Sequence, residues 1–468
     1  MIHRYFCALH VLLLAGLFVP PAAAQTSDTR KAVEAPRAAK PGSVDNAEMA
    51  SRVRQEFLHA WNAYKQFAWG HDELRPLSKS ARDWYGASLY MTPLDSLDTM
   101  ILMGLREEAE STREYIVKNL SFDHDIYVKN FEITIRMLGG LLSNYQLTGD
   151  KRLLVLAEDL GNRLLPAFNS KTGMPYVFVN LKTGAVRGEV SNPAEIGTLL
   201  VEFGALSKLT GKPIYYDKAK RALVELYNRR SSIGLVGSGI NVETGAWTNT
   251  QSHIRGLIDS YYEYLLKGWL LFGDKDCKRM WKASIKALNK YVADEMTSGL
   301  WYSTVDMNTG ARLARHYGAL DAFFPAVLAL SGDLKRAKRL QESSYTMWTT
   351  FGIEPEELDY STMKVTSRGY PLRPEIIESA FTLYRLTKDP RYLEMGRTFF
   401  DSLVKYCKSE AGYAALRNVE TKEKRDNMES FFLAETLKYL YLLYAPPETI
   451  DLNKMVFNTE AHPIRKTW

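Results

Sequence analysis

The stretch Leu147-Thr148-Gly149-Asp150 ends one apolar segment and begins an amphipathic one, and similar stretches recur along the chain. Glycine takes the left-handed position after a helix, and Asp or Pro begins the next helix. Each copy therefore predicts a tight joint between two antiparallel helices. The other copies are Leu209-Thr210-Gly211-Lys212-Pro213, Leu271-Phe272-Gly273-Asp274, Leu330-Ser331-Gly332-Asp333 and, more weakly, Leu386-Thr387-Lys388-Asp389-Pro390.

The joints define a structural repeat. Their glycines are 62 residues apart (149 to 211 and 211 to 273), then 59 apart (273 to 332). Segments before each joint are apolar throughout and predict inner helices, whereas segments after it are amphipathic and predict outer ones. Seven inner helices with outer partners predict an all-α fold, a closed (α/α)7 barrel, with short β-hairpins in the loops on one face. An open α-solenoid is the alternative, although such arrays usually have repeats of about 34 to 47 residues.

The first residues have the pattern of an export signal. A short basic start precedes an apolar run from Ala8 to Val19, and Ala22-Ala23-Ala24 offers a cleavage site before Gln25. We expect a signal peptide over 1–24, a disordered lead-in over 25–45 and a catalytic domain over 46–468; an uncut signal anchor is the alternative. No later run approaches the roughly 18 apolar residues of a membrane helix. The mature protein is therefore expected to be soluble and either periplasmic or secreted.

Composition argues against several classes of protein. The formal net charge is +6 and no basic stripe is present, so nucleic acid is not expected as a partner. Once the signal peptide is removed, only Cys277 and Cys407 remain, and the sequence leaves open whether they pair. No Cys/His cluster has the spacing of a structural zinc site.

Acidic residues stand near the predicted starts of the inner helices. Their spacing follows the repeat, with 63 residues from Glu132 to Glu195, 64 from Glu195 to Asp259 and 62 from Asp259 to Asp321. Any one of them could be structural, because helix N-termini stabilise negative charge. As a set they indicate a functional site, since carboxylates that converge on one cavity repel each other and need compensation. The residues are Asp95, Asp98, Glu132, Glu195, Asp259, Asp321, Glu375, Glu378, Glu429 and Glu435.

Carboxylates in an aromatic-walled pocket are typical of glycoside hydrolysis. One acid protonates the leaving oxygen, and another activates water or attacks the sugar. Arg136 lies four residues after Glu132, and Phe431 four before Glu435, so each pair shares a helix face. A site so rich in oxygen ligands would suit calcium. These patterns predict a carbohydrate-active α/α barrel and leave the sugar open.

Several longer motifs carry a resemblance to a known family. They keep their order from about residue 50 to the last residues, and together they resemble the class I α-1,2-mannosidases, glycoside hydrolase family 47. The motifs are Phe131-Glu132-Ile133-Thr134-Ile135-Arg136-Met137-Leu138-Gly139-Gly140, Asp95-Ser-Leu-Asp98-Thr99-Met100, Asp259-Ser-Tyr-Tyr-Glu-Tyr264-Leu-Leu-Lys267, Leu372-Arg-Pro-Glu375-Ile-Ile-Glu378-Ser379, Met428-Glu-Ser-Phe-Phe432-Leu-Ala-Glu435-Thr436 and Val456-Phe-Asn-Thr459-Glu460-Ala-His-Pro463.

The resemblance implies an (α/α)7 barrel with a C-terminal hairpin that reaches into it, and exo-acting removal of terminal α-1,2-linked mannose from a mannose oligosaccharide or N-glycan. It implies inversion of configuration, which requires room for a water between acid and base. By position, Glu132 resembles the general acid, acting through a water, and Glu375 the general base. Asp259 resembles the third catalytic carboxylate, whose role stays open.

The same resemblance implies one bound calcium ion. Thr459 resembles its ligand, through both the backbone carbonyl and the hydroxyl oxygen. Waters and two sugar hydroxyls would complete the coordination. The carboxylates that would hold those waters are Glu375, Glu378, Glu435 and Glu460. The other residues expected at the substrate are Arg136, Glu195, Asp321, Arg373 and the stacking ring of Phe431.

The chain departs from the eukaryotic pattern at a few positions. Leu257 stands where an arginine precedes the catalytic aspartate, Ala322 stands where a histidine often follows Asp321, and no cysteine follows Asp321 closely. We therefore expect a bacterial-type member whose branch preference is open. Separately, we expect a monomer. The alternatives are a non-catalytic glycan-binding protein and a hydrolase of another sugar on a related barrel.

Overall fold

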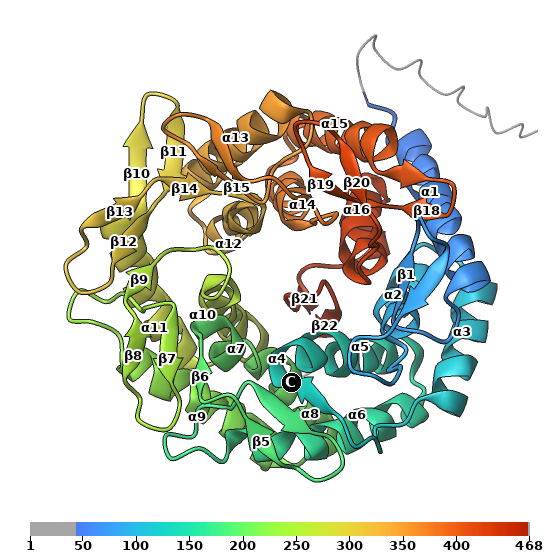
Figure 1. Cartoon of the computed structure of the whole chain (residues 1–468), viewed down its shortest axis with the longest axis horizontal. Coiled ribbons are helices and arrows are strands. Elements are labelled where there is room, and N and C mark those ends of the chain that lie inside the picture. Colours follow the sequence, from blue (N-terminus) through green and yellow to red (C-terminus); the bar gives the residue numbers. More distant parts are fainter. Residues whose placement is uncertain (1–43, 467–468) are drawn as a thin grey trace, which may run out of the picture. The chain divides into compact units, whose positions relative to one another are not determined.

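The computed structural model describes residues 44–466, and their helices form two concentric layers around a common axis (Figure 1). The predicted signal peptide and the lead-in up to residue 43 lie outside the described residues. Within 44–466, seven helical segments form the inner layer. They are α2 (Met91–Leu102); α4, the π-helix η1 and α5 (Asn130–Ile133, Thr134–Leu138, Gly139–Thr148); α7 and α8 (Pro193–Gly197, Leu200–Thr210); α10 (Asp259–Phe272); η4 and α12 (Ala319–Phe323, Phe324–Leu330); α14 (Glu375–Thr387); and the π-helix η5 with α16 (Phe432–Thr436, Leu437–Tyr444).

The outer layer is amphipathic, as predicted. Helix α6, for example, buries Leu153, Ala157, Leu160 and Leu164, which share one face. The outer helices of the described part are α1 (Asn46–Phe67), α3 (Arg106–Asn119), α6 (Lys151–Leu164) followed by η2 (Leu165–Phe168), α9 (Pro213–Asn228), α11 (Lys275–Ala287) followed by η3 (Leu288–Val292), α13 (Leu334–Phe351) and α15 (Arg391–Tyr406).

The two ends of the helical array meet. Helix α1 packs against α16, and α2 packs against η5, so the first helices contact the last ones and the array closes into a ring. This closure makes the open solenoid wrong. Seven inner segments with seven outer helices in residues 44–466 form the (α/α)7 arrangement.

The repeated joints have the predicted backbone. Gly149, Gly211, Gly273 and Gly332 have φ of 76°, 73°, 67° and 96°, which is the left-handed region that glycine adopts without strain. Lys388 in the weakest copy also has a positive φ, 58°. The following helices begin as expected, because the side chains of Asp150, Asp274 and Asp333 accept hydrogen bonds from backbone N–H groups, and Pro213 is the first residue of α9.

Short strands fill the loops between the helices. In residues 44–466 they pair only in antiparallel fashion, within sheets of two or three strands. The sheets are β1 (Glu73–Arg75) with β2 (Ser80–Arg82); β3 (Tyr127–Lys129), β4 (Phe178–Asn180) and β5 (Val186–Arg187); β6 (Val190–Ser191), β7 (Gly239–Asn241) and β8 (Trp247–Asn249); β9 (Gln251–Ser252), β12 (Thr304–Asp306) and β13 (Arg312–Ala314); β10 (Ala293–Met296) with β11 (Gly299–Tyr302); β14 (His316–Tyr317), β15 (Glu357–Asp359) and β16 (Lys364–Ser367); β17 (Lys408–Ser409) with β18 (Gly412–Tyr413); β19 (Ala415–Asn418) with β20 (Glu423–Arg425); and β21 (Met455–Phe457) with β22 (Pro463–Arg465).

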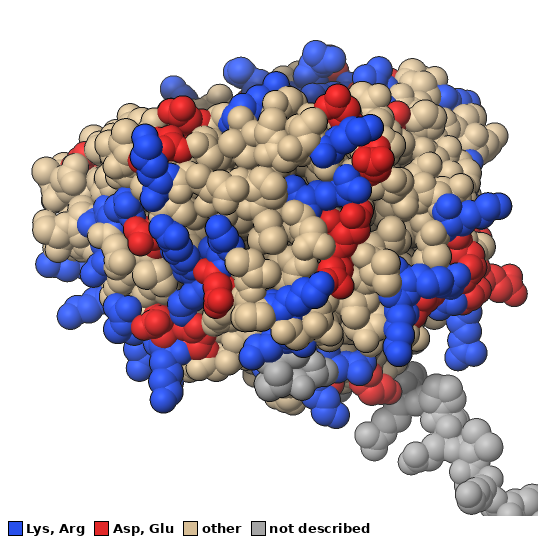
Figure 2. Space-filling model, turned by 90° about the horizontal axis from the view of Figure 1, so that it is seen from below, with Lys and Arg blue, Asp and Glu red and all other residues tan. Residues whose placement is uncertain are grey.

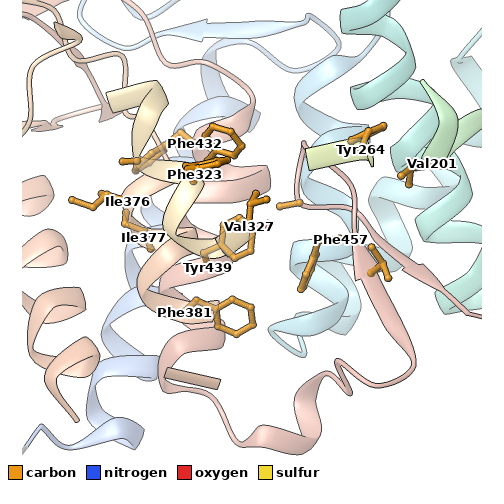
Figure 3. Close-up of a cluster of buried hydrophobic side chains, with 14 of the residues drawn as sticks. Val201, Tyr264, Phe323, Val327, Ile376, Ile377, Phe381, Phe432, Tyr439 and Phe457 are labelled. Atoms are coloured by element: carbon orange, nitrogen blue, oxygen red, sulfur yellow. The ribbon is translucent and has the colours of Figure 1, made fainter. Parts of the chain in front are cut away.

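The last hairpin, β21–β22, lies inside the ring (Figure 1). The short helix η6 (Pro447–Thr449) precedes it in the chain. Strand β21 contacts α10 and β22 contacts α5. Phe457 packs its ring against Phe381 of α14 and Tyr439 of α16, with centroids 6.1 and 5.5 Å apart (Figure 3). The hairpin therefore brings residues 458–462 among the inner helices.

Several acids do not open their inner helices as the spacing suggested. Helix α2 begins at Met91, four residues before Asp95, and the seventh segment begins at Phe432, after Glu429. Asp259 and Glu375 are the first residues of α10 and α14, as predicted. Glu132, Glu195 and Asp321 lie in the first turns of the second, third and fifth segments, so the acids of the first and seventh segments are the exceptions.

Two further features of the described residues concern the cysteines and membranes. Cys277 and Cys407 are free and buried, so they do not pair. No helix in residues 44–466 has the length and apolar character needed to cross a membrane. On the face shown in Figure 2, Lys and Arg side chains lie among Asp and Glu side chains.

Candidate active site

One cavity of about 630 Å³ opens among the inner helices, a volume within the usual range of small-molecule sites. Every residue that the sequence singled out for catalysis, substrate binding or metal binding lines it. They are Glu132, Arg136, Glu195, Asp259, Asp321, Arg373, Glu375, Glu378, Phe431, Glu435, Thr459 and Glu460. Their convergence is a finding, while the role of each residue stays a prediction.

The cavity wall is strongly acidic. Its lining carries eleven carboxylate side chains against four cationic ones, Lys129, Arg136, Arg255 and Arg373. The carboxylates that the sequence analysis did not include are Glu263, Glu356 and Glu357. So large an excess of like charge in a partly enclosed space raises carboxyl pKa values or requires a bound cation.

Glu132 and Arg136 form an ion pair on one helix face. Arg136 donates to Glu132 Oε2 from Nε (3.1 Å) and from Nη2 (3.0 Å). The side chain of Glu132 is 21% exposed and that of Arg136 only 7% exposed, so the carboxylate reaches the cavity from a buried support. Arg136 lies in the π-helix η1, and π-helical turns often occur at functional sites.

Aromatic rings surround the cations of this wall. The Arg136 guanidinium lies 5.2 Å from the Trp84 ring centroid and 5.6 Å from that of Phe431. The Arg373 guanidinium lies 5.7 Å from the Phe431 ring centroid. These cation–π contacts fix the Phe431 ring, which is one candidate surface for stacking a sugar.

Asp259 and Glu375 are carboxyls that burial makes harder to ionise. Burial raises the pKa of Asp259 to about 6, although a 2.8 Å hydrogen bond from the Ser260 backbone N–H opposes the shift. Burial likewise raises the pKa of Glu375 to about 7, against the effect of nearby Arg373. Glu375 Oε2 has no hydrogen-bond partner among the described residues, so it is available to a water or a ligand.

Three more acids of the cavity wall show the same effect. Burial raises the pKa of Glu378 to about 8 and that of Asp321 to about 8, with Lys267 and Arg255, respectively, acting in the opposite direction. Burial and then nearby Glu460 hold the pKa of Glu435 well above its usual range. Glu195 also lines the cavity and pairs with Lys129 at 3.3 Å.

Thr459 is held by residues that sequence reasoning missed. Its hydroxyl donates to Glu263 Oε2 at 2.8 Å, and Glu263 is paired in turn with Lys267. Lys267 Nζ also donates to the Asn458 carbonyl at 3.3 Å. The signal was present in the sequence, because Asp259, Glu263 and Lys267 follow one another at four-residue steps on one face of α10.

Arg373 and Arg255 are oriented by two more acids outside the prediction. Arg373 donates to Glu356 Oε1 at 2.9 Å and to Oε2 at 3.2 Å. Arg255 pairs with Glu357 at 2.7 Å. Both glutamates come from the segment around β15, which has no repeated spacing and gave no sequence signal.

Three residues next to the site have strained backbone. Leu257, Leu372 and Ala461 have φ of 79°, 69° and 58°, although none is glycine. They lie two residues before Asp259, three before Glu375 and two after Thr459. Such left-handed conformations cost about 1–3 kcal/mol each and persist where the surrounding structure imposes them.

Asp95, Asp98 and Glu429, which the sequence analysis placed among the converging acids, do not line the cavity. Asp95 and Asp98 are fully buried behind it and contact His462. Glu429 accepts a hydrogen bond from Asn427 at 2.9 Å. The repeat spacing located their helices correctly but could not show which way each side chain points.

The environment of Thr459 fits a hard divalent cation. Its hydroxyl proton is engaged with Glu263, which leaves oxygen lone pairs free, and the surrounding acids supply the negative charge that calcium prefers. Within residues 44–466, no three His, Cys, Asp or Glu side chains are arranged as a direct metal-ligand cluster. The case for a cation here therefore rests on the two Thr459 oxygens as direct ligands and on carboxylates that would act at longer range.

Comparison with known proteins places this geometry in context. The sequence model of the family described as glycosyl hydrolase family 47 matches residues 56–466 of this chain. The alpha-mannosidase I MNS4 of Arabidopsis thaliana is 41% identical over 436 residues, covering 89% of this chain and 69% of the relative. The mannosyl-oligosaccharide 1,2-alpha-mannosidase MNS1 of the same plant is 38% identical over 439 residues, covering 88% and 78%.

A solved structure agrees with the fold. The alpha-1,2-mannosidase from Trichoderma reesei superposes with a TM-score of 0.83 at 29% sequence identity, over 91% of this chain and 100% of that one. A cellobiose 2-epimerase from Bacillus thermoamylovorans also superposes, with a TM-score of 0.55 at 12% identity, and that likeness concerns the fold alone.

Proposed function

The chain belongs to glycosyl hydrolase family 47 and is a mannosyl-oligosaccharide 1,2-α-mannosidase, and we propose that it removes terminal α-1,2-linked mannose with inversion and with one bound calcium ion. The single observation that carries the proposal is the convergence of Glu132, Asp259, Glu375 and Thr459 on one acidic cavity. A protein that only bound glycans would need neither an acid nor a base there, so this set argues against a purely lectin-like function.

Glu132 is proposed as the general acid. Both hydrogen bonds from Arg136 go to Oε2, which leaves Oε1 for a water that leads to the glycosidic oxygen. Asp259 is proposed as the third carboxylate, which positions water or shares the work of the acid. Its raised pKa means that it can hold a proton near neutral pH.

Glu375 is proposed as the general base on the attacking water. Its free Oε2 supplies the acceptor, and Arg373, two residues earlier, keeps a cation beside it. A base with a pKa near the working pH combines correct protonation with useful proton affinity. Inversion follows in this scheme because the water, and not the carboxylate, attacks the sugar carbon.

Calcium would be held by the Thr459 carbonyl and hydroxyl oxygens. Glu375, Glu378, Glu435 and Glu460 would hold its waters, and their lining of the same cavity supports this assignment. When bound, the ion would orient sugar hydroxyls and lower the pKa values of the surrounding carboxyls. Glu263 fixes the Thr459 hydroxyl, and Phe431 offers a ring for stacking against the mannose.

Glu195, Asp321, Arg136 and Arg373 are proposed to contact the sugars, on free mannose oligosaccharides or on N-glycans. We further propose a monomeric, exported enzyme, periplasmic or secreted, of the bacterial type. Export rests on residues 1–24, and N-terminal sequencing of the mature protein tests it, with Gln25 expected first. The bacterial grouping rests on the lack of a cysteine soon after Asp321.

The function is tested with mannosyl-α-1,2-mannose. The released sugar is followed by NMR with calcium and with a chelator, and β-mannose should appear first and only with calcium. Glu375→Gln should still bind the disaccharide but lose turnover, because the amide cannot accept the proton of water. Initial α-mannose would contradict inversion, binding without turnover would support a lectin, and normal turnover by Glu375→Gln would remove it from the base role.

A further inference from the structure

A buried cluster of charged side chains lies directly behind the cavity wall and does not line it. We call it the His462 cluster; it comprises Asp95 and Asp98 of α2, Lys438 of α16 and His462 of the C-terminal hairpin. All four side chains are fully buried. Such groups are costly to bury unless each is paired, so the arrangement calls for a reason.

Each ring nitrogen of His462 faces a carboxylate. Nδ1 lies 2.7 Å from Asp98 Oδ2, and Nε2 lies 3.1 Å from Asp95 Oδ1. A neutral imidazole has one nitrogen that can only accept, and that lone pair would then face a carboxylate oxygen. Only the imidazolium donates to both acids. Although burial lowers the pKa of His462, Asp98 and Asp95 raise it to about 9, which agrees with the geometry.

The charged groups around His462 come from α2, η1, α8, α16 and the turn of the C-terminal hairpin. Lys438 pairs with Asp98 at 2.7 Å. Two hydroxyls also bind the aspartates, because Ser143 donates to Asp98 and Ser430 donates to Asp95. Glu202 of α8 is close enough to His462 to interact with it electrostatically, and it accepts hydrogen bonds from Asn458 and Tyr264. The charged groups facing His462 are Asp95, Asp98, Glu202, Lys438, Glu460 and, through Asp95, Arg136.

The cluster is connected to the proposed acid. Asp95 lies 3.6 Å from Arg136 Nη1, and Arg136 holds both Glu132 and Glu460. On the other side, Lys438 donates to the Ala461 carbonyl at 2.7 Å, next to Glu460. His462 therefore links the C-terminal hairpin, which carries Thr459, to helix α2, whose Asp95 contacts Arg136.

We propose that His462 is a positioning residue that acts as a permanent imidazolium: its charge keeps Asp95 ionised and in place, and Asp95 then holds Arg136 in the position that orients Glu132. This inference rests on the proposed function for its link to catalysis. The charge state of His462 itself does not depend on that function.

The charge state is tested by ¹⁵N NMR of histidine-labelled, calcium-loaded protein at pH 8, with His462→Gln used for assignment. Both nitrogens of His462 should show the protonated signature. His253 is the internal control, since burial and Arg255 lower its pKa to about 3 and it should be neutral. A neutral His462 at pH 8 would overturn the proposal whatever the enzyme hydrolyses.

The positioning role is tested by kinetics on mannosyl-α-1,2-mannose. His462→Gln should lower kcat on the order of 100-fold with KM little changed, because small displacements of catalytic groups cost that much. Asp95→Asn should also lower kcat, and adding His462→Gln to it should lower kcat little further, because His462 acts through Asp95 in this proposal. Losses of the two single variants that multiply in the double variant, or a normal kcat in His462→Gln, would refute the role; a wild type without turnover would refute the proposed function instead.

Discussion

Gly139 at the start of α5 offers a sharp test of how the C-terminal hairpin is held. A Cβ atom at this position would lie 2.6 Å from Asn458 Nδ2 and 3.1 Å from His462 Cδ2. The Asn458 amide cannot simply move, because it donates to the Ile135 carbonyl at 2.9 Å and to Glu202 Oε1 at 2.8 Å. Gly139→Ala must therefore displace the hairpin or break buried hydrogen bonds.

The expected cost follows from opposing effects. Overpacking a well-filled core costs about 1–3 kcal/mol, and two weakened hydrogen bonds add about 1 kcal/mol each. Alanine regains roughly 1 kcal/mol of helix propensity over glycine. The free energy of unfolding should thus fall by about 2–4 kcal/mol, and the displacement should also reach Thr459, which follows Asn458 in the chain.

Unfolding in urea, calcium affinity and kcat are measured together, with Gly396→Ala as the matched control. A Cβ at Gly396 in the outer helix α15 would be equally crowded, at 2.2 Å from Leu443 Cδ2 and 2.7 Å from the Tyr444 hydroxyl, but neither group lies at the cavity. Both variants should be destabilised, and only Gly139→Ala should also lose calcium affinity and kcat. Wild-type stability in Gly139→Ala, or the same functional loss in both variants, would refute this reasoning.

Two further predictions concern Asp321 and Leu257. The pKa of Asp321 is about 8 in the folded state and near 4 in the unfolded state, so between these pH values the folded state keeps a proton that the unfolded state releases, and stability falls as pH rises from about 4 to 8. In urea unfolding of the calcium-free protein, Asp321→Asn should show a shallower fall of the unfolding free energy with pH. A fall as steep as that of the wild type would contradict this assignment. Leu257 lines the cavity and is 53% exposed. Leu257→Arg should therefore add hydrogen-bond donors and sharpen the preference among the α-1,2 linkages of a branched oligosaccharide, whereas Leu257→Gly should not. A product profile of Leu257→Arg identical to that of the wild type would contradict this role.

The repeat and the composition of its helices were sufficient to predict the ring. Joint glycines at Gly149, Gly211, Gly273 and Gly332 reflect a local backbone requirement, and local requirements can be identified from sequence. The same holds for the cavity, because inward-facing acids at equal register must meet at one end of a barrel. This shared register explains why the predicted residues Glu132, Asp259 and Glu375 all line the cavity.

The supporting residues could not be predicted in the same way. Glu356 and Glu357 reach the cavity from the start of the short strand β15, in the connection between α13 and α14, whose path depends on the completed tertiary fold. Asp95 and Asp98 have the right spacing but point behind the wall, since α2 begins at Met91 and its rotation is fixed by packing against η5. The π-helical turns at Arg136 and Glu435 also alter side-chain direction, and no simple sequence period reveals them.

The free energy that a helix dipole contributes can be compared with the cost of burying an ionised carboxyl, and the comparison decides whether the inward acids are structural or functional. Asp259 and Glu375 are the first residues of α10 and α14, where the helix dipole stabilises a carboxylate by about 0.3–1 kcal/mol. Burial has nevertheless raised the pKa of Asp259 from 3.8 to about 6, which corresponds to roughly 3 kcal/mol against the ionised form. The dipole is therefore too weak to account for these acids as helix caps. Acids kept in such positions lower stability unless a cation compensates them, and that compensation is what the proposed calcium ion beside Thr459 would supply.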